Sequence, residues 1–477
     1  MNYGVILNVL GGLLRFLAAI MLVPLFVALY YGDSLYPFLA AIIITGLTGI
    51  LLSYYYKATD EWKAREGFAI VAFGWLAAAI SGSIPFMVDG FSPINAIFES
   101  MSGFTTTGAT VLVDIEAHSR SILFWRSMIQ WIGGMGIIML FIAILPKLGV
   151  AGRQLFRAET PGPTEDKIKP RIRETAKILW LVYVFISMLE VIALLLAKMS
   201  LYDAVTHTFT TMACGGFSPY SQSIAAFNSP LIEGIITLFM FISGANFALH
   251  YRTLYTNRQS LLKDDEFKFY LLVTVIATLL LTFSLWSDMG ETVLTAFRYA
   301  VFQVVSIITT TGFATADFNM WTDSAKIVLL AVMFIGGCAG STSGGIKVVR
   351  FLLLLKYAQR ALFKSIHPRA VKPIKLNNKT VPDDVMQAIV SFVVIYFMIF
   401  AISTGLLSLM GIDIISSITS SIATLGNIGP GFGLVGPMAN FAAIPFVGKI
   451  VLIANMWIGR LEVFTVIVML TPEFWKR

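Results

Sequence analysis

Long apolar stretches alternate with short polar segments along the whole chain. The first two stretches lie near residues 3–30 and 36–56, and the charge-poor Gly32-Asp33-Ser34 joins them. Each is about as long as the roughly 20 residues that an α-helix needs to cross a bilayer. We therefore expect two transmembrane helices at the start of the chain.

After these two helices one pattern occurs four times. Each copy has a long apolar span, a segment of about 10 to 15 mixed residues that ends in a Thr/Gly-rich tract, and a second long span. The short segments are too brief to cross a bilayer and too polar to face lipid, so they should be re-entrant half-helices buried in protein. The period of roughly one hundred residues indicates an internal repeat of whole transmembrane modules.

The predicted fold is an all-α polytopic membrane protein with four pseudo-symmetric span/pore-helix/span modules around one central pore. Two extra N-terminal transmembrane helices precede the modules. The expected boundaries are 1–60 for these two helices, 61–146 for module 1, 147–260 for module 2 with a preceding cytoplasmic loop, 261–365 for module 3 with an interrupted second helix, and 366–477 for module 4.

The four Thr/Gly-rich tracts supply the candidate binding residues. Aligned on one glycine each, with the two residues before it, they comprise Thr106, Thr107 and Gly108; Ala213, Cys214 and Gly215; Thr310, Thr311 and Gly312; and Thr424, Leu425 and Gly426. Glycine adopts φ > 0 at little cost, so each loop can turn successive carbonyl oxygens toward an axis. Rings of carbonyls replace the hydration shell of an ion, and the tracts hold no carboxylate that would favour a divalent one.

Composition restricts the class of protein. Of the 477 residues, 57% are hydrophobic and 13% are charged, which leaves too little polar surface for a soluble catalytic domain. The two cysteines lie far apart in Gly-rich apolar segments, so we expect neither a disulfide nor a thiolate metal site. The four histidines show no metal-ligand spacing, and we expect no enzyme activity and no organic cofactor.

The net charge of +7 reflects membrane orientation rather than nucleic acid binding. Of the 34 basic residues, 26 fall in alternate segments: 57–65, 147–177, 252–268, 347–379 and 476–477. The intervening segments hold almost none, which is the pattern of loops that stay in the cytoplasm. Both termini should therefore be cytoplasmic.

Three further motifs, combined with the four tracts, resemble the Trk/Ktr/HKT superfamily of potassium transporters, and most closely its Trk-type pore subunit. They are Trp131-Ile132-Gly133-Gly134-Met135-Gly136, the run from Phe334 to Gly345, and Gly459-Arg460-Leu461-Glu462. The resemblance covers the whole chain and implies that the aligned tract residues form a selectivity filter for K⁺. A glycine at all four anchoring positions goes with potassium selectivity in this superfamily, although one key glycine per tract suggests some passage of Rb⁺ and Na⁺.

The second span of module 3 is interrupted by Gly336, Gly337, Cys338, Ala339, Gly340, Ser341, Thr342, Ser343, Gly344 and Gly345. Such a run disfavours a continuous helix, because each interior glycine costs about 1 kcal/mol relative to alanine. A flexible packing kink would explain it. The resemblance implies instead an intramembrane gating loop that blocks the pore below the filter.

Arg460 is the most conspicuous charge in the last span. An arginine at membrane depth costs at least about 2.5 kcal/mol, so it should face the interior and find a partner. One interpretation is a structural salt bridge to Glu462 or Glu190. The resemblance implies the other, a positive barrier to K⁺ in the pore.

Several buried polar residues carry weaker hypotheses. Bonds between modules are expected for Gln130, Asn246 and Gln303; stabilisation of half-helices or pairing across repeats for Glu99, Asp203 and Asp413; and attraction of cations to the outer mouth for Asp114 and Asp317.

The resemblance also implies the setting. We expect K⁺ uptake across the bacterial plasma (inner) membrane driven by the membrane potential, with K⁺/H⁺ or K⁺/Na⁺ symport, or transport of another small solute, as alternatives. The expected partners are the lipid bilayer, a second copy in a homodimer, and a cytosolic nucleotide-binding (RCK-type) regulatory ring. The long basic segments 147–177 and 347–379 are candidates to meet either anionic lipid or this ring.

Overall fold

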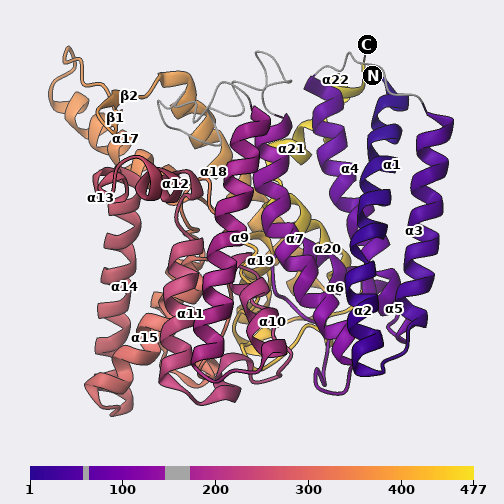
Figure 1. Cartoon of the computed structure of the whole chain (residues 1–477). Helices are drawn as coiled ribbons and strands as arrows, with labels where there is room; N and C mark the ends of the chain where they lie inside the picture. Colours follow the sequence, from indigo (N-terminus) through magenta and orange to yellow (C-terminus); the bar gives the residue numbers. More distant parts are fainter. Residues whose placement is uncertain (57–63, 145–171, 477) are drawn as a thin grey trace.

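Long apolar helices lie side by side in the computed structural model, which describes residues 1–56, 64–144 and 172–476 (Figure 1). The chain opens with α1 (Tyr3–Ile20), α2 (Leu22–Tyr31) and α3 (Tyr36–Tyr55). The first two form one apolar span from Tyr3 to Tyr31 and α3 forms a second. Both predicted N-terminal transmembrane helices are therefore present.

The first two spans approach each other closely at two glycines. A Cβ added to Gly11 of α1 would lie 2.8 Å from the carbonyl oxygen of Gly49 in α3, and a Cβ on Gly49 would lie equally close to the oxygen of Gly11. Small residues let helix backbones pack tightly in a membrane, where burial of apolar area between helices contributes little. The two N-terminal spans stand at the edge of the molecule, where α1 packs against α4 of module 1.

The four expected modules follow in order. Their helices are α4 (Ala64–Gly82), α5 (Ile84–Val88), α6 (Pro93–Phe104) and α7 (Arg120–Ile144) in module 1; α9 (Ile172–Leu196), α10 (Leu201–Met212), α11 (Pro230–Ser243) and α12 (Phe247–Tyr255) in module 2; α14 (Asp265–Met289), α15 (Val293–Ile308), α16 (Asp323–Met333) and α17 (Val348–Ile366) in module 3; and α18 (Asp383–Leu409), α19 (Ile414–Leu425), α20 (Phe446–Arg460) and α21 (Phe464–Ile467) in module 4.

Smaller elements connect these helices. They are α13 (Ser260–Lys263), α22 (Pro472–Trp475), the 3₁₀ turns η2 (Ser223–Phe227), η3 (Phe318–Met320), η4 (Gly433–Val435) and η5 (Val468–Leu470), and the antiparallel strands β1 (Lys375–Leu376) and β2 (Lys379–Thr380). The strands pair Lys375 with Thr380 and Leu376 with Lys379, which makes a small hairpin after α17.

The spanning helices differ in continuity. Among the described residues, six helices are long and apolar enough to cross a membrane, and two more bent pairs qualify if each counts as one span. The pair α11 and α12 bends by 98°, and α20 with the turn from Phe464 to Leu470 bends by 110°. In module 3, α16 ends at Met333 and α17 begins at Val348, so the predicted interruption is confirmed.

The short helix that follows the first span of each module, namely α6, α10, α15 or α19, is the predicted half-helix. The helices α6, α10 and α19 have 12 residues and α15 has 16. Helices of this length are marginal alone, so packing and caps must hold them. Side chains of Ser200, Thr292 and Asp413 accept backbone N–H groups at three of the N-termini, and Pro93 begins the fourth helix, where its missing N–H costs nothing.

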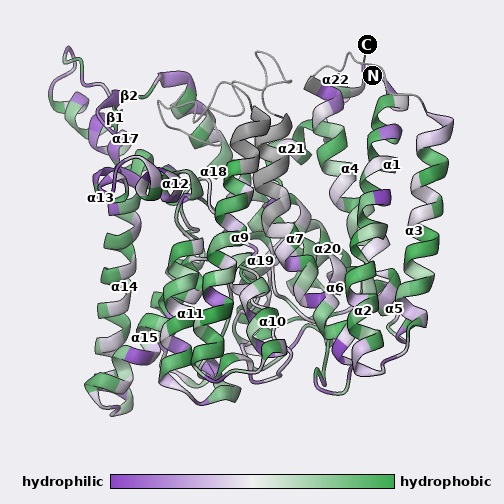
Figure 2. Ribbon diagram, in the orientation of Figure 1, coloured by the Kyte–Doolittle hydropathy of each residue, from purple (hydrophilic) through white to green (hydrophobic). Residues whose placement is uncertain are grey.

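Polar and basic residues collect at one end of the molecule. Both chain termini lie at this end in Figure 1, and the hydrophilic colouring of Figure 2 gathers over α12, α13, α17 and the hairpin, whereas α3 and α14 are mainly hydrophobic. By the distribution of Lys and Arg this end is cytoplasmic. Most of the basic segment 147–177 lies outside the described residues.

Candidate functional site

Four short loops follow the half-helices and share one backbone path. We call them the axial loops: residues 105–108, 213–216, 309–312 and 426–429. In each loop the third residue donates its N–H to a carbonyl five residues earlier, in the last turn of the half-helix. The bonds are Thr107 to Ser102 at 2.8 Å, Gly215 to Thr210 at 2.8 Å, Thr311 to Ser306 at 2.9 Å, and Ile428 to Ala423 at 2.8 Å.

The backbone angles repeat as well. The second residue of each axial loop has a positive φ without being glycine, at 51° to 56° for Thr106, Cys214, Thr310 and Asn427. The fourth residue is always a glycine with positive φ: 82° for Gly108, 72° for Gly216, 83° for Gly312 and 102° for Gly429. Non-glycine residues in this region cost about 1–3 kcal/mol each, so the surrounding structure must hold them there.

These angles correct the expected alignment in two modules. Gly216 and Gly429, rather than Gly215 and Gly426, occupy the place of Gly108 and Gly312. Gly426 is the first residue of its loop, and the expected Thr424 and Leu425 form the end of α19. The tract of module 4 was therefore aligned three residues too early and that of module 2 one residue too early.

A sequence signal for the correct alignment exists in the half-helix rather than in the tract. Gly108, Gly216 and Gly429 follow the N-cap residues Ser92, Ser200 and Asp413 by the same number of residues. Module 3 has a longer interval because α15 is one turn longer. Counting residues from the start of the half-helix identifies Gly216 and Gly429, whereas matching the tracts by their similarity to Thr-Thr-Gly does not.

The axial loops close into a ring. A Cβ added to Gly108, Gly216 or Gly312 would overlap a carbonyl oxygen of the next module, which belongs to Gly215, Thr311 and Ile428 respectively. A Cβ on Gly429 would lie 2.8 Å from the carbonyl oxygen of Thr107 in module 1. Each glycine thus lies against the third residue of the next loop, in the cyclic order 1, 2, 3, 4, 1. The four modules surround one axis, as predicted.

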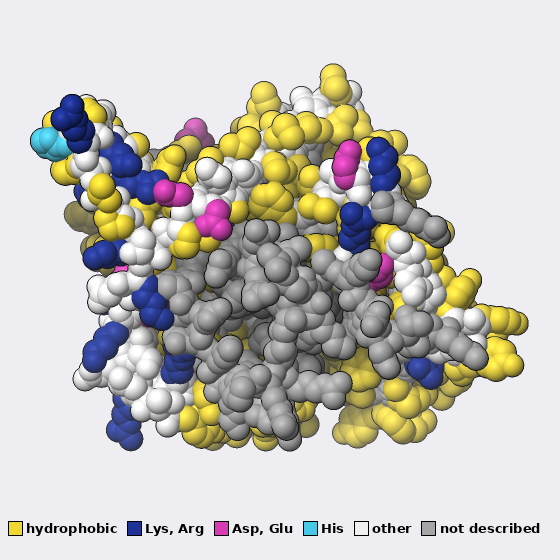
Figure 3. Space-filling model, turned by 90° about the horizontal axis from the view of Figure 1, so that it is seen from above, with side chains coloured by type: hydrophobic (Ala, Val, Ile, Leu, Met, Phe, Trp, Pro, Cys, Tyr) yellow, Lys and Arg dark blue, Asp and Glu magenta, His cyan; other side chains and the backbone are white. Residues whose placement is uncertain are grey.

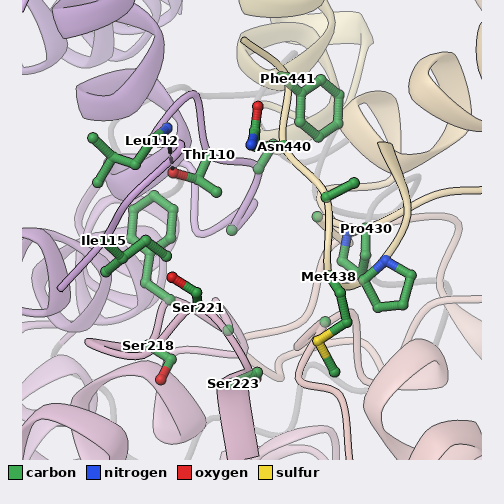
Figure 4. A pocket seen from close by; sticks show the side chains of 18 of the residues that line it. Thr110, Leu112, Ile115, Ser218, Ser221, Ser223, Pro430, Met438, Asn440 and Phe441 are labelled. Atoms are coloured by element: carbon green, nitrogen blue, oxygen red, sulfur yellow. Dashed lines mark hydrogen bonds between the residues drawn. The ribbon is translucent and has the colours of Figure 1, made fainter. Parts of the chain in front are cut away.

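A solvent-open pocket lies at the ring on the side away from the cytoplasm (Figure 4). All four positive-φ glycines contribute to it, and its empty space is about 640 Å³. Hydroxyl groups and apolar side chains of modules 1 and 2, among them Leu112 and Ile115, line one part, and Pro430, Met438, Asn440 and Phe441 of module 4 line another. Its described lining contains Arg126 but no carboxylate. Asp114 and Asp317, the candidate cation attractors, are not part of it; they accept backbone N–H groups of Ala117 and Asn319.

Buried polar side chains brace the ring from outside. Glu99 of α6 pairs with Arg126 of α7 at 2.5 Å, and its carboxylate also accepts the N–H of Val111. Arg126 donates to the carbonyl of Ser218 in module 2 and lies 3.8 Å from the centre of the Phe217 ring. The side chain of Arg126 is 2% exposed and that of Glu99 is fully buried. Glu99 therefore ties its half-helix to the following loop and, through Arg126, to the next module.

Gln130 makes the expected bond between modules. Its amide nitrogen donates to the carbonyl of Gly215 at 2.7 Å, and its amide oxygen accepts the N–H of Phe217. Gln303 bonds within its own module, to the carbonyl of Phe313.

Asp203 and Asp413 stabilise half-helix N-termini, as expected. Asp413 accepts the N–H of Ser416, and Asp203 bonds with Ser200 and Tyr220.

The interruption in module 3 lies against the ring. We call residues 334–347 the inserted loop; its two ends meet at a parallel bridge between Ile335 and Ile346. Gly344 donates its N–H to the Thr310 hydroxyl at 2.7 Å, and the Thr342 hydroxyl contacts the Cys214 sulfur at 3.1 Å. Both contacts are to second residues of axial loops, in modules 2 and 3. The loop therefore occupies the side of the ring opposite the pocket.

Arg460 holds the inserted loop. It is 5% exposed, and its Nη1 donates to the carbonyl of Thr342 at 2.8 Å. No ion pair joins it to Glu462 or Glu190 within the described chain, so the expected structural salt bridge is wrong. Glu462 pairs instead with Arg350 of α17 at 2.5 Å, because the positive φ of Glu462 and Val463 turns the chain at the end of α20.

Two other charged residues stabilise the inserted loop, Lys347 from within it and Glu266 from α14, and the sequence did not single them out. Lys347 is buried and donates to the carbonyl of Ser343. Glu266, at the start of α14, accepts the N–H of Ala339 at 2.6 Å. Asn246 caps α12 and lies next to Gly340 of the loop. Cys214 and Cys338 are both buried and free, which agrees with the absence of a disulfide in the prediction.

Comparisons of the sequence and of the structure with known proteins place the chain in one family. The sequence profile of the family described as TrkH, cation transport protein, matches residues 36–477. The chain belongs to the TrkH family. The Trk system potassium uptake proteins TrkH of Salmonella typhimurium and Escherichia coli K12 are each 42% identical to this chain, with 100% of both chains covered.

A solved structure shows the same fold within the TrkH family. The crystal structure of the potassium transporter TrkH from Vibrio parahaemolyticus has a TM-score of 0.91 and 38% sequence identity, and the match covers 100% of both chains. TrkG of Escherichia coli K12, also named as a Trk system potassium uptake protein, is 34% identical over 99% of this chain. The resemblance inferred from the motifs is therefore confirmed, and the chain is a multi-pass membrane protein.

Proposed function

We propose that this chain carries K⁺ through the ring of axial loops, as a gated, channel-like uptake protein of the bacterial plasma (inner) membrane. The observation that carries the proposal is the closed contact of each positive-φ glycine with a carbonyl of the next module. A ring so built places backbone carbonyls around one axis, and carbonyls replace the hydration shell of an alkali cation. Potassium is the ion named for the TrkH relatives.

In this proposal the selectivity filter is the set of axial loops as the structure aligns them. The half-helices end at the ring, and a helix C-terminus carries partial negative charge that favours a cation. Each axial loop has one positive-φ glycine, at its fourth position, so the filter has fewer ordered carbonyl rings than a long Gly-rich filter. We therefore expect K⁺ to be preferred, with Rb⁺ and some Na⁺ also passing.

The inserted loop is the proposed gate, and Arg460 adds an electrostatic barrier. The loop is bonded to two axial loops, so a cation cannot pass on that side while these bonds hold. The Arg460 guanidinium contacts the loop at Thr342, where a fixed positive charge repels a cation. Opening then requires the loop to leave Thr310 and Cys214.

The membrane potential suffices as the driving force. Moving one charge across 100 mV is worth about 2.3 kcal/mol. At roughly 1.4 kcal/mol per tenfold, this sustains about a 50-fold accumulation of K⁺. The proposed partners are a second copy of the chain and a cytosolic nucleotide-binding ring that acts on α17 and the inserted loop from the cytoplasmic side.

The test is K⁺ and Rb⁺ flux into liposomes that contain the chain alone, with an imposed voltage and no pH gradient. Flux that follows the voltage supports the proposal. Flux that appears only with a proton or sodium gradient supports symport instead. Absence of cation flux under all three conditions, with the regulatory partner supplied, contradicts the proposal; strict exclusion of Rb⁺ and Na⁺ contradicts the expected imperfect selectivity.

A further inference from the structure

We infer that the segment from α12 to the start of α14 binds anionic lipid headgroups and thereby holds the inserted loop closed. The inference rests on the proposed role of that loop as the gate. The segment runs through α12 and α13 and crosses the cytoplasmic end of α14 in Figure 1. It begins where α11 bends by 98°, so α12 lies across the direction of the spanning helix before it.

The two ends of this segment bond to the inserted loop. At the first end, Phe247 donates its N–H to the carbonyl of Gly340 at 3.1 Å, and the preceding carbonyl of Gly244 accepts the N–H of Cys338 at 2.9 Å. At the other end, the carboxylate of Glu266 accepts the N–H of Ala339 at 2.6 Å. Three consecutive residues of the loop, 338–340, are therefore fixed by the segment. Movement of the segment must strain or break these bonds.

The outer surface of the segment combines exposed apolar and basic side chains. Leu254, Tyr255 and Leu262 are 57%, 74% and 66% exposed. Arg258, Lys263 and Lys268 are exposed beside them. A helix that carries apolar residues with Lys and Arg on its open side is typical of elements that lie in a membrane interface.

The acidic residues of the segment are less exposed than these basic residues: Asp264 and Asp265 are part-buried, and Asp265 also pairs with Lys356 at 3.6 Å. Asp264 caps α14 at Phe267 and accepts a hydrogen bond from Asn377, and Asp265 also bonds Asn377. Glu266 is buried against the inserted loop. The open face is thus positive, and Lys and Arg gather along this edge of the cytoplasmic face in Figure 3. Its complement is the negatively charged cytoplasmic leaflet.

The binding test uses a fluorescent label on the full chain. Leu262→Cys gives one exposed thiol, since both native cysteines are buried. The labelled protein is reconstituted in phosphatidylcholine vesicles with one third brominated phosphatidylglycerol or one third brominated phosphatidylcholine. We expect stronger quenching by the brominated anionic lipid. R258Q/K263Q/K268Q should remove the difference, whereas the control K364Q/R369Q/K372Q, which neutralises three exposed charges on and after α17, should keep it.

The functional test measures voltage-driven K⁺ flux without a regulatory protein. We expect flux in vesicles with one third phosphatidylglycerol to be at least about threefold lower than in pure phosphatidylcholine. R258Q/K263Q/K268Q should show equal, high flux in both lipids, and the control variant should behave as the native chain.

Four outcomes would overturn the inference. Equal quenching by both brominated lipids would exclude a headgroup preference, and loss of the difference on adding inorganic phosphate would assign the site to free anions. An equal effect of the control variant K364Q/R369Q/K372Q would show that the general surface charge of the protein, rather than this segment, causes the lipid preference. Flux that ignores lipid composition but responds at these three residues to a cytosolic protein would assign the surface to that protein. Absence of flux in every lipid would contradict the proposed function, while the quenching result would still stand.

Discussion

The axial loops and the inserted loop are in direct contact, yet they are held in opposite ways. The axial loops repeat one backbone path four times, and each contacts the next through a glycine and a carbonyl. The inserted loop occurs in one module, and its bonds come from side chains and backbone of modules 2 and 4 as well as from its own module. The ring is therefore symmetric and rigid in principle, whereas the loop is asymmetric and depends on bonds that can be broken singly.

The contacts between the two regions show the same asymmetry. At the second position of the axial loops, Cys214 and Thr310 bond to the inserted loop, whereas Asn427 bonds to Thr107 and the carbonyl of Met456. The hydroxyl of Thr106 is buried with no hydrogen-bond partner among the described residues. The inserted loop is thus hydrogen-bonded to the axial loops of modules 2 and 3, whereas it only packs against that of module 4, where a Cβ on Gly344 would lie 2.6 Å from the carbonyl oxygen of Gly426.

The largest expected effect is on the brace of the ring. Glu99→Gln leaves Arg126 buried without its carboxylate, and removing one partner of a buried ion pair costs about 3–5 kcal/mol. We expect a large fall in the midpoint of thermal unfolding in detergent. Glu462→Gln, in the ion pair that braces α17 just after the inserted loop, should lower it less, because Glu462 is 23% exposed whereas Glu99 is fully buried. Equal falls in the unfolding midpoint for the two variants would show that the two ion pairs stabilise the protein to the same extent.

The next effect distinguishes the two possible alignments of module 4. Gly429→Ala places a Cβ against the carbonyl of Thr107 at a φ of 102°, so we expect K⁺ uptake to fall about tenfold or more. Gly426→Ala keeps a φ of −80°, which alanine adopts without strain, and its Cβ meets only its own module, at the carbonyl oxygen of Ile422 (2.8 Å) and the side chain of Ile428 (3.0 Å), so uptake should fall less. Uptake by cells that lack other potassium systems measures both. A larger loss for Gly426→Ala would restore the alignment expected from the sequence.

A smaller effect is expected at the contact of Arg460 with the inserted loop. Arg460→Gln removes a positive charge beside the inserted loop and weakens the bond to Thr342; if the proposed barrier is correct, flux of the chain alone should rise several-fold. The exposed Arg15 of α1 provides a control, and Arg15→Gln should leave flux unchanged. Unchanged flux for Arg460→Gln, with a lower yield of folded protein, would assign Arg460 a structural role only.

The smallest effect concerns pH at the outer side of the ring. Burial raises the pKa of Glu116, but hydrogen bonds from the Ser221 side chain and backbone outweigh it, and the pKa lies below its ordinary value of 4.5. The contact of modules 1 and 2 is thus present above pH 4.5 and is lost as the pH falls through the folded pKa. Between pH 6 and 3 we expect thermal stability to fall slightly less in Glu116→Gln than in the native chain. Identical pH profiles would exclude this contribution.

The sequence predicted most of the fold because the bilayer imposes strict lengths on apolar segments. The two opening helices and the four modules follow from the alternation of apolar spans with short polar segments, and the interruption before Lys347 follows from the run of glycines. Sequence reasoning predicted the four-module architecture, but it aligned the tracts of modules 2 and 4 by the similarity of a few residues. The position of the positive-φ glycine is set by where the half-helix before it begins and ends, which the similarity of three residues does not report.

The sequence did not predict which partners the buried charged residues bond to. Arg460 could be recognised as costly at membrane depth, but the sharp turn at Glu462 sends that carboxylate to Arg350 and leaves Arg460 with a backbone carbonyl. Glu266 and Lys347 gave no signal, since their role depends on the inserted loop returning to α14. The sequence by itself determined the spans, the repeat and the residue types at the axis. Only the tertiary structure decided the ring alignment and the bonds of the inserted loop, because both arise from contacts between modules about a hundred residues apart.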